Sequence, residues 1–349
     1  MWFKNIRLYC LTQPFDLSSE NFELQLADHA FIPCSNYDKS RIGWVSPMGN
    51  AAPDLNAASA EGTGSVGSVE SGEDVEEGAD ESSEVAPLLT HTVGNYIMLC
   101  AQMQDRLLPA SVVREATEEK VAEIEARQGR KVYRKEKREI QDDVYSYLLP
   151  RAFTRSTKVY AYISREENLL VVDAASAPKA EDLLNLLRDT LGSFPVALPD
   201  STRAPSDVMT RWLKEQSATD NFHIHADCEL VNPKDGSNVV RCKSQDLEGD
   251  EIQAHLDAGK QVRQLGVQWN NQLSCSIVED LTIRRLRFED IREESDNFEE
   301  ESQAQKFDQE FVLMTLQLNA FFKAFFNAFG GLEDPRNKEL PDNRNKEGF

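Results

Sequence analysis

The sequence lacks the features that mark membrane-bound and secreted proteins. It contains no long apolar run of the kind that crosses a bilayer. The segment from Met1 to Arg7 has neither the continuous apolar stretch nor the small-residue cleavage site of a signal peptide. We therefore expect a cytoplasmic protein without a membrane partner. Two-fifths of its 349 residues are apolar, which is enough for a substantial core.

Cysteine is scarce, and the motifs of several enzyme classes are absent. There is no Walker A sequence, no HExxH and no nucleophile elbow, and no pair of acidic residues is marked out as catalytic. We therefore expect no catalytic residues and no cofactor. The six cysteines include no CxxC pair and are expected to be reduced and mostly buried; they are Cys10, Cys34, Cys100, Cys228, Cys242 and Cys275.

Positive charge is also in short supply. The chain has 38 Lys and Arg residues against 60 Asp and Glu residues, a formal net charge of -22 that by itself argues against a nucleic-acid partner. The acidic residues are concentrated, however. Ten of them lie between Asp54 and Glu84 without any Lys or Arg, and a second acidic run covers residues 289–310. A nucleic-acid partner therefore requires that basic residues gather in other parts of the chain.

Residues 51–87 have the composition of a disordered insertion. They are mainly Ala, Gly, Ser, Asp and Glu, and cannot bury enough surface to offset the entropy lost on ordering. The GxGxxG match at residues 62–67 lies inside this segment, where neighbouring carboxylates would repel a pyrophosphate, so we reject a dinucleotide site there. We also expect a flexible tail over residues 333–349.

The rest of the chain predicts an α+β body of antiparallel sheets with packed helices. Its N-terminal part is residues 1–50, and residues 88–332 form the remainder, including a helical region at 111–149 in which Ser111 would cap the first helix. Strands are expected over 2–10, 95–100, 159–163, 169–173, 194–198, 265–269, 273–277 and 281–288. Helices are expected over 17–30, 111–128, 131–149, 178–191, 206–217 and 249–258.

The strongest local pattern is an aromatic helix at residues 303–329. Large apolar residues recur there at steps of three and four: Phe307, Phe311, Met314, Leu318, Phe321 and Phe325. Periodicity alone favours a core helix over a surface that contacts a second copy of the chain. If the helix does form a dimer contact, Phe321 and Phe325 are its candidate residues.

Basic residues gather in three groups. One lies between Arg127 and Arg138 in the helical region, and a second follows Pro150 as Arg151, Arg155 and Lys158. The third is the predicted strand with Arg284, Arg285 and Arg287, preceded by Lys243 and Lys260. Residues two apart in a strand share one face, so Arg285 and Arg287 are placed to follow a phosphate backbone.

His223 and His225 share one face of a predicted strand, which is one way to begin a metal site. No further Cys or His follows at ligand spacing, so we expect no metal there. Two alternatives to nucleic-acid binding stay open. One is an adaptor whose acidic segments bind basic proteins, and the other is a metal-dependent hydrolase built on these histidines and nearby acids.

Several segments together resemble one known family. They include residues 1–5 (MWFKN), 43–49 (GWVSPMG), 148–155 (LLPRAFTR), 243–247 (KSQDL) and 311–315 (FVLMT). In this collinear order, over nearly the whole chain, the sequence resembles the recombination-associated RdgC family. The resemblance implies an α+β, ring-forming homodimer whose positively charged hole holds duplex DNA without sequence preference. It also implies a nucleoid-associated protein without catalytic activity that opposes RecA-promoted recombination.

The resemblance also assigns individual residues. Phe153 matches a residue of the dimer interface, and Lys243 and Gln245 match a block near the ring contact. Ser244 stands where a second lysine often occurs. With the basic groups above, the expected DNA contacts are Arg151, Arg155, Lys243, Gln245, Lys260, Arg285 and Arg287. The expected dimer contacts are Phe153, Phe321 and Phe325.

Overall fold

The computed structural model describes residues 2–16, 18–49, 87–289 and 302–333. Apart from a few residues at their edges, the predicted insertion at 51–87, with its GxGxxG match, and the predicted tail at 333–349 lie outside these residues. The same holds for positions 290–301 of the second acidic run.

One twelve-stranded antiparallel sheet organises the described residues, as the α+β prediction requires. Its order is β2-β4-β5-β6-β1-β12-β11-β10-β8-β9, with β3 beside β4 and β7 beside β1. The strands are β1 (Ile6–Leu11), β2 (Ser40–Val45), β3 (Thr90–Val93), β4 (Tyr96–Leu107), β5 (Phe153–Ser164), β6 (Leu169–Asp173), β7 (Val196–Ala197), β8 (Phe222–Asn232), β9 (Asp235–Cys242), β10 (Gln261–Trp269), β11 (Leu273–Val278) and β12 (Ile283–Phe288).

The helices occupy the faces and one end of this sheet. They are α1 (Ser19–Ala27), α2 (Ala110–Gln128), α3 (Arg134–Leu148), α4 (Ala177–Leu191), α5 (Pro205–Glu215), α6 (Asp250–Asp257) and α8 (Gln303–Ala328), with a short 3-10 turn at Leu149–Arg151. The leucines whose spacing predicted α4 belong to one core cluster with residues of β1, β4, β5 and β6. Five of the six cysteines are buried, and all six are free thiols.

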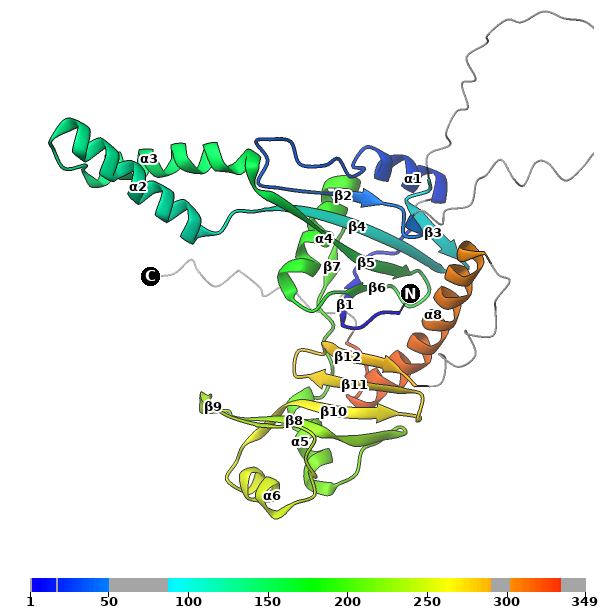
Figure 1. The fold of residues 1–349 in the computed structure, drawn as a ribbon. Coiled ribbons are helices and arrows are strands. Elements are labelled where there is room, and N and C mark those ends of the chain that lie inside the picture. Colours follow the sequence, from blue (N-terminus) through cyan, green and yellow to red (C-terminus); the bar gives the residue numbers. More distant parts are fainter. Residues whose placement is uncertain (1, 17, 50–86, 290–301, 334–349) are drawn as a thin grey trace, which may run out of the picture.

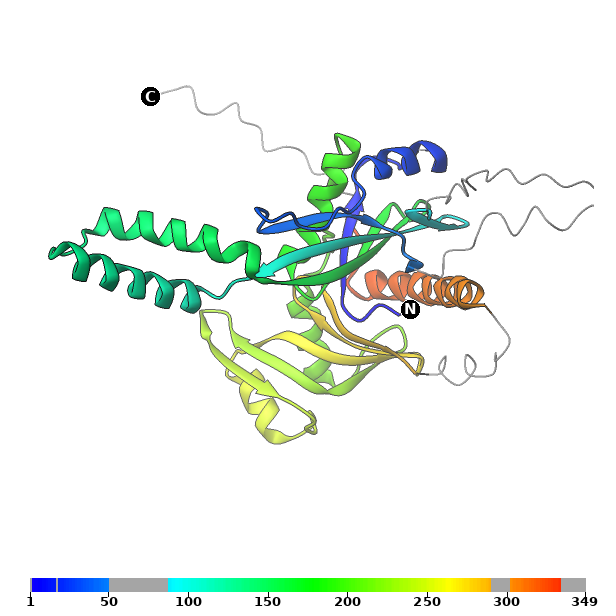
Figure 2. The same cartoon turned by 45° about the horizontal axis from the view of Figure 1, so that its top comes forward.

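The sheet divides into two arms where β1 meets β12. The only residue pair that joins these strands in register is Ile6 with Ile283. Figures 1 and 2 show the arms diverging from this waist, with α2 and α3 at the end of one and the β8–β9 hairpin and α6 on the other. The waist is therefore the place where residues from both arms come together.

Helix α8 fills the junction between the arms, and its position corrects one prediction. Phe321 and Phe325 are both fully buried. The Phe321 ring lies 5.9 Å from Phe222 and 5.7 Å from Trp269, while Phe311 lies 6.1 Å from Tyr162 of the other arm. These rings belong to the chain's own core, so Phe321 and Phe325 present no surface to a second copy.

The length and apolar composition of α8 also correct the expectation that no segment could cross a bilayer. Of the described helices it alone is long and apolar enough to do so, although much of its apolar surface is packed in the core. A helix that joins two halves of a sheet needs an equally wide apolar stripe, so composition does not separate the two cases.

The helical region is a hairpin of two helices that projects from the sheet (Figures 1 and 2). Helix α2 begins at Ala110 after Pro109, so Ser111 lies inside the first turn and is not the predicted cap. Gly129 ends α2 with a φ of +64°, a left-handed conformation that glycine adopts without strain. Only Val113 and Thr117 of α2 are buried, and no residue of α3 is.

Candidate nucleic-acid interface

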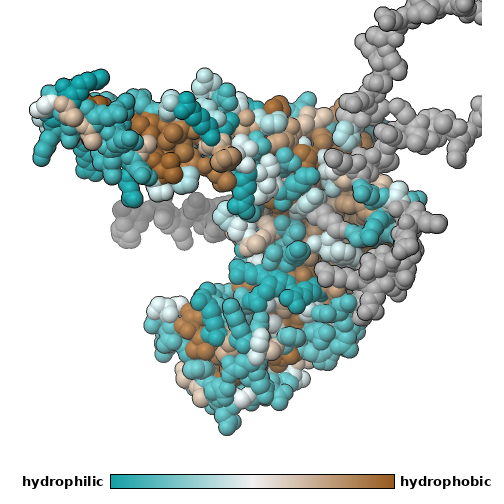
Figure 3. Space-filling view, viewed as in Figure 1, coloured by the Kyte–Doolittle hydropathy of each residue, from teal (hydrophilic) through white to brown (hydrophobic). Residues whose placement is uncertain are grey.

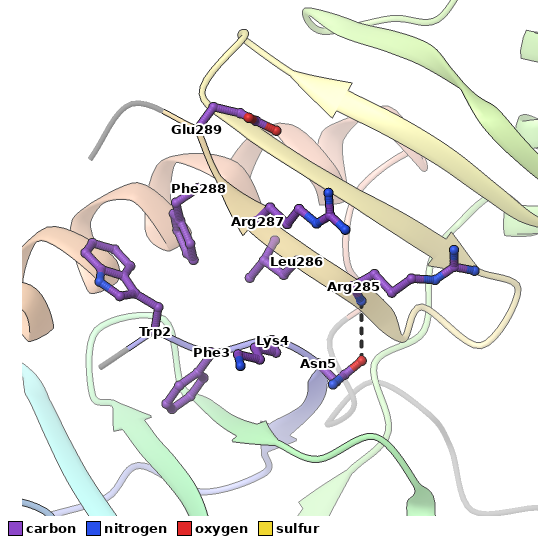
Figure 4. Close-up of a pocket in the computed structure, with 9 residues that line it drawn as sticks. All are labelled: Trp2, Phe3, Lys4, Asn5, Arg285, Leu286, Arg287, Phe288 and Glu289. Carbon is purple, nitrogen blue, oxygen red and sulfur yellow. Dashed lines mark hydrogen bonds between the residues drawn. The ribbon is translucent and has the colours of Figure 1, made fainter. Parts of the chain in front are cut away.

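Strand β12 presents its arginines at the waist. Ile283 and Leu286 are buried in the core, whereas Arg285 and Arg287 are exposed. Figure 4 shows the Arg285 and Arg287 side chains extending on the same side of the strand. The strand is less regular than predicted, because its register with β11 is interrupted and Arg285 has a φ of +53°. This irregularity lets Ile283 and Leu286 both be buried although they are three residues apart, which strict alternation would not allow.

Arg285 is partly neutralised by an acidic neighbour. Its Nη1 lies 2.8 Å from Oδ2 of Asp227, and Oδ1 of Asp227 accepts a hydrogen bond of 2.9 Å from the Ser244 backbone N–H. The Ser244 N–H, together with the charge of Arg285, lowers the pKa of Asp227. Arg287, in contrast, has no ion-pair partner within the described ranges.

The same carboxylate brings a second predicted segment close to β12. Because Asp227 binds both Ser244 and Arg285, the loop that carries Lys243 comes near the Arg285 guanidinium, although β11 and β10 lie between β12 and β8 in the sheet. Lys243 is exposed, and Gln245 donates a hydrogen bond of 2.7 Å to Glu251 Oε1. Lys243, Arg285 and Arg287 therefore form one basic group, which we call the waist group.

Lys260 does not belong to this group. Its side chain is buried, and Nζ lies 2.5 Å from Oδ1 and 3.2 Å from the carbonyl oxygen of Asn238. The ammonium group is thus held by the β9 strand instead of being presented to a ligand. The prediction that Lys260 contacts DNA is wrong for this conformation, because a sequence does not reveal whether a lysine stem is buried.

The remaining predicted residues lie at the start of β5, on the other arm. Phe153 is 85% exposed and pairs in register with Leu107 of β4, which is 49% exposed. Arg155 is exposed and pairs in register with Asp105. Arg151 stacks 4.1 Å above the Tyr147 ring and donates a hydrogen bond to its hydroxyl. Hydrophobic surface also gathers over the neighbouring α2 and α3 helices (Figure 3).

A residue that the sequence analysis missed fixes this segment. The Arg106 guanidinium donates hydrogen bonds to the carbonyl oxygens of Leu149, Pro150 and Ala152, and to that of Ser35. It thereby ties the turn before Phe153 to the sheet. A lone arginine at the end of an apolar strand gives no sequence signal of this role, because its partners are backbone atoms distant in sequence.

The predicted site therefore divides between two places. The waist group lies at the junction of the arms, while Arg151, Phe153 and Arg155 lie beside the helical hairpin. His223 and His225 are exposed on β8, and no three potential metal ligands cluster anywhere in the described ranges. These features define a large antiparallel α+β protein with exposed arginines at its waist and an exposed aromatic residue at the base of a helical hairpin.

Comparisons with known proteins identify the family. The family model described as "Putative exonuclease, RdgC" matches residues 1–63 and 75–332. The chain is 38% identical over 334 residues to the "Recombination-associated protein RdgC" of Aeromonas hydrophila, covering 95% of this chain and 99% of that protein. It is 39% identical over 337 residues to the protein of the same name from Pseudomonas aeruginosa, covering 96% and 99%. The chain belongs to the RdgC family, as its resemblance predicted.

Proposed function

We propose that this protein binds duplex DNA without sequence preference, encircles it as a ring-shaped homodimer, and restrains RecA-dependent recombination without catalysing a reaction. The observation that carries the proposal is the pair of exposed arginines on one side of β12, where the two arms meet. Guanidinium groups bind phosphate oxygens well, and phosphate contacts position a protein on DNA without reading its sequence. The names of the relatives point to recombination and mention no catalytic activity.

In the proposed ring, the waist group would contact phosphates and Phe153 would lie at a contact between the two copies. Closure around the duplex limits escape, so individual contacts do not need to be strong. Arg151, Arg155 and Gln245 would add polar contacts at the rim. Such a protein would act on the nucleoid in the cytoplasm.

The test is duplex binding by fluorescence anisotropy over a series of salt concentrations. The informative variant is Arg285→Ala with Arg287→Ala. Its matched control is Lys179→Ala with Arg188→Ala, which removes two positive charges from α4. Each lost phosphate contact should reduce the log–log salt slope by about 0.9. The proposal is overturned if both double variants fold and bind duplex DNA like the parent, or if the parent strongly prefers one sequence.

Two further measurements test the ring and the absence of catalysis. Native mass spectrometry with and without linear duplex DNA should give two chains, and two chains per duplex at low occupancy. A monomer bound to DNA would exclude the ring. Incubation of end-labelled duplex with the protein and Mg²⁺ should leave the DNA intact. If the labelled strand is shortened with the protein but keeps its length in a parallel sample without protein, the result would instead support the exonuclease activity named in the family description.

A further inference from the structure

A cavity beside the waist group combines cations with an aromatic wall. Its volume is about 690 Å³, within the ~300–1,000 Å³ range typical of small-ligand sites. It lies where the chain segment before β1 separates from β12, so residues 2–5 form one side and residues 285–289 form the other. Figure 4 shows these two segments facing each other across the space.

Two contacts join the two sides of the cavity, one near β1 and one nearer the N-terminus. Near β1 they are joined, because the Leu286 N–H donates a hydrogen bond of 2.8 Å to the Lys4 carbonyl oxygen. Further out they are held by Trp2 and Phe288, whose ring centroids are 4.7 Å apart at an interplanar angle of 52°. Both residues are only partly buried: they pack on the core cluster and also line the cavity.

Charged residues line the same cavity as this aromatic pair. Lys4 and Arg287 are exposed, and neither side chain has an ion-pair partner among the residues the structure describes. Glu289 is the one acidic residue of the lining, and its Oε1 accepts a hydrogen bond of 2.7 Å from Ser274. The lining therefore holds more positive than negative charge, together with two partly buried aromatic residues.

We propose that this cavity binds one unpaired nucleotide, with the base against Trp2 and Phe288 and the phosphate near Lys4 and Arg287. Aromatic side chains stack with any base, and cations alongside them follow the backbone, which is how single strands are bound without sequence preference. A paired base is stacked in its duplex and has no free face to offer. The nucleotide can come from a single strand or be free in solution, and the inference rests on the proposed function only for the first source.

Trp2 supplies its own optical signal. The other three tryptophans, Trp44, Trp212 and Trp269, are all buried, so Trp2 is the indole that a stacked base can reach. Titration of the full-length protein with a short oligothymidylate, and separately with dAMP, should quench tryptophan emission. Trp2→Phe keeps an aromatic face and should bind oligothymidylate while losing the quench. Trp2→Ala should weaken oligothymidylate binding by roughly tenfold, since one stacked base contributes on the order of this factor.

The controls separate this site from the duplex-binding surface. Tyr37→Ala removes an aromatic side chain that is 89% exposed and outside the cavity, and should leave both ligands unaffected. Lys4→Gln tests the site where Trp2→Ala does not fold. It should weaken oligothymidylate binding several-fold more than Lys179→Gln does, while the affinity for a blunt hairpin duplex changes equally in the two variants.

Several results would overturn the inference. These are a parent protein that binds duplex DNA but shows no quench with either ligand, a quench that persists in Trp2→Phe, and equal losses of single-strand and duplex affinity in Trp2→Ala. A quench with dAMP alone assigns the cavity to free nucleotides. A quench with either ligand, combined with no binding of duplex DNA, supports the cavity and refutes the proposed function.

Discussion

Phe153 offers the sharpest test of the proposed ring, because its environment within one chain is already known. The side chain is 85% exposed, and its cross-strand neighbour Leu107 is 49% exposed. An exposed phenylalanine contributes little to the stability of a monomer, so Phe153→Ala should change the free energy of unfolding of one chain by no more than about 0.5 kcal/mol. This exposure places Phe153 outside the core of its own chain.

The expected effect on the dimer is much larger. Burying a phenylalanine side chain fully is worth about 1.5–3 kcal/mol. A two-fold contact buries both copies of the residue, so the loss at one contact of the ring is about 3–6 kcal/mol. Every 1.4 kcal/mol is a factor of ten, and the contact should therefore open by more than about a hundredfold. The second contact would still hold the two chains together.

Three measurements on Phe153→Ala distinguish the outcomes. Native mass should still give a dimer, thermal unfolding should stay cooperative, and retention of linear duplex DNA should fall. Tyr37→Ala is the matched control, since it removes an aromatic side chain that is also almost fully exposed. Unchanged DNA retention together with an unchanged dimer would remove Phe153 from the mechanism. A variant that unfolds would contradict the prediction that this side chain contributes little to the stability of one chain.

Three further predictions concern charge. Asp227→Asn should strengthen duplex binding a few-fold by anisotropy, because it releases Arg285 from an exposed ion pair worth only about 0.2–1 kcal/mol; weaker binding would show that the pair positions the arginine. Lys260→Met should lower the free energy of unfolding in urea by about 1.5–3 kcal/mol through its lost bonds to Asn238, yet leave the DNA affinity of the folded protein unchanged. Deleting residues 54–86 removes ten carboxylates and should modestly tighten binding at low salt, an effect that fades beyond a Debye length of about 10 Å. Non-cooperative melting of the deleted chain would contradict the view that this segment is dispensable for the fold.

Helices that pack on one side were predictable from the sequence. The spacing of Leu183, Leu184 and Leu187 placed α4, and the aromatic steps placed α8 to within one residue of its end. The spacing of the apolar residues in α8 does not reveal which surface the helix packs against. Its stripe is buried between two arms of one chain, and the same stripe would suit an interface between two chains.

Strands whose side chains are mostly exposed were predicted less well, because they lack the alternation of apolar and polar residues from which a strand is predicted. Strand β9 is mostly exposed, so it shows no alternation of apolar and polar residues, and its place in the sheet comes from backbone pairing with β8. Residues 2–5 were expected to continue β1. They leave it because the Asp173 carboxylate accepts hydrogen bonds from the backbone N–H groups of Lys4 and Asn5. The cavity beside β12 lies where these residues leave the strand. No pattern in the sequence predicts this cavity.

The exposure of the predicted site residues followed from backbone details that spacing does not encode. Arg285 and Arg287 both reach solvent, as alternation predicted, but through an irregular strand in which Arg285 has a positive φ. The Asn5 side chain accepts a hydrogen bond of 3.3 Å from the Arg285 N–H and supports this conformation. The sequence around Lys260 does not distinguish it from an exposed lysine, yet its side chain is buried.

The negative net charge of this chain does not exclude the proposed DNA binding, because electrostatic repulsion acts only over a short distance at physiological salt. A formal charge of -22 repels DNA from afar, but at physiological salt each charge is screened beyond about 8 Å. What a bound phosphate experiences is therefore the set of side chains within that distance. The waist group supplies Lys243, Arg285 and Arg287, with Asp227 offsetting one of them, and Lys4 and Glu289 line the same cavity as the two arginines. In the proposed ring, weak attraction from such a small set is sufficient, because closure around the duplex supplies retention that charge does not. Acidic residues elsewhere would then limit binding at open surfaces without abolishing it inside the proposed ring.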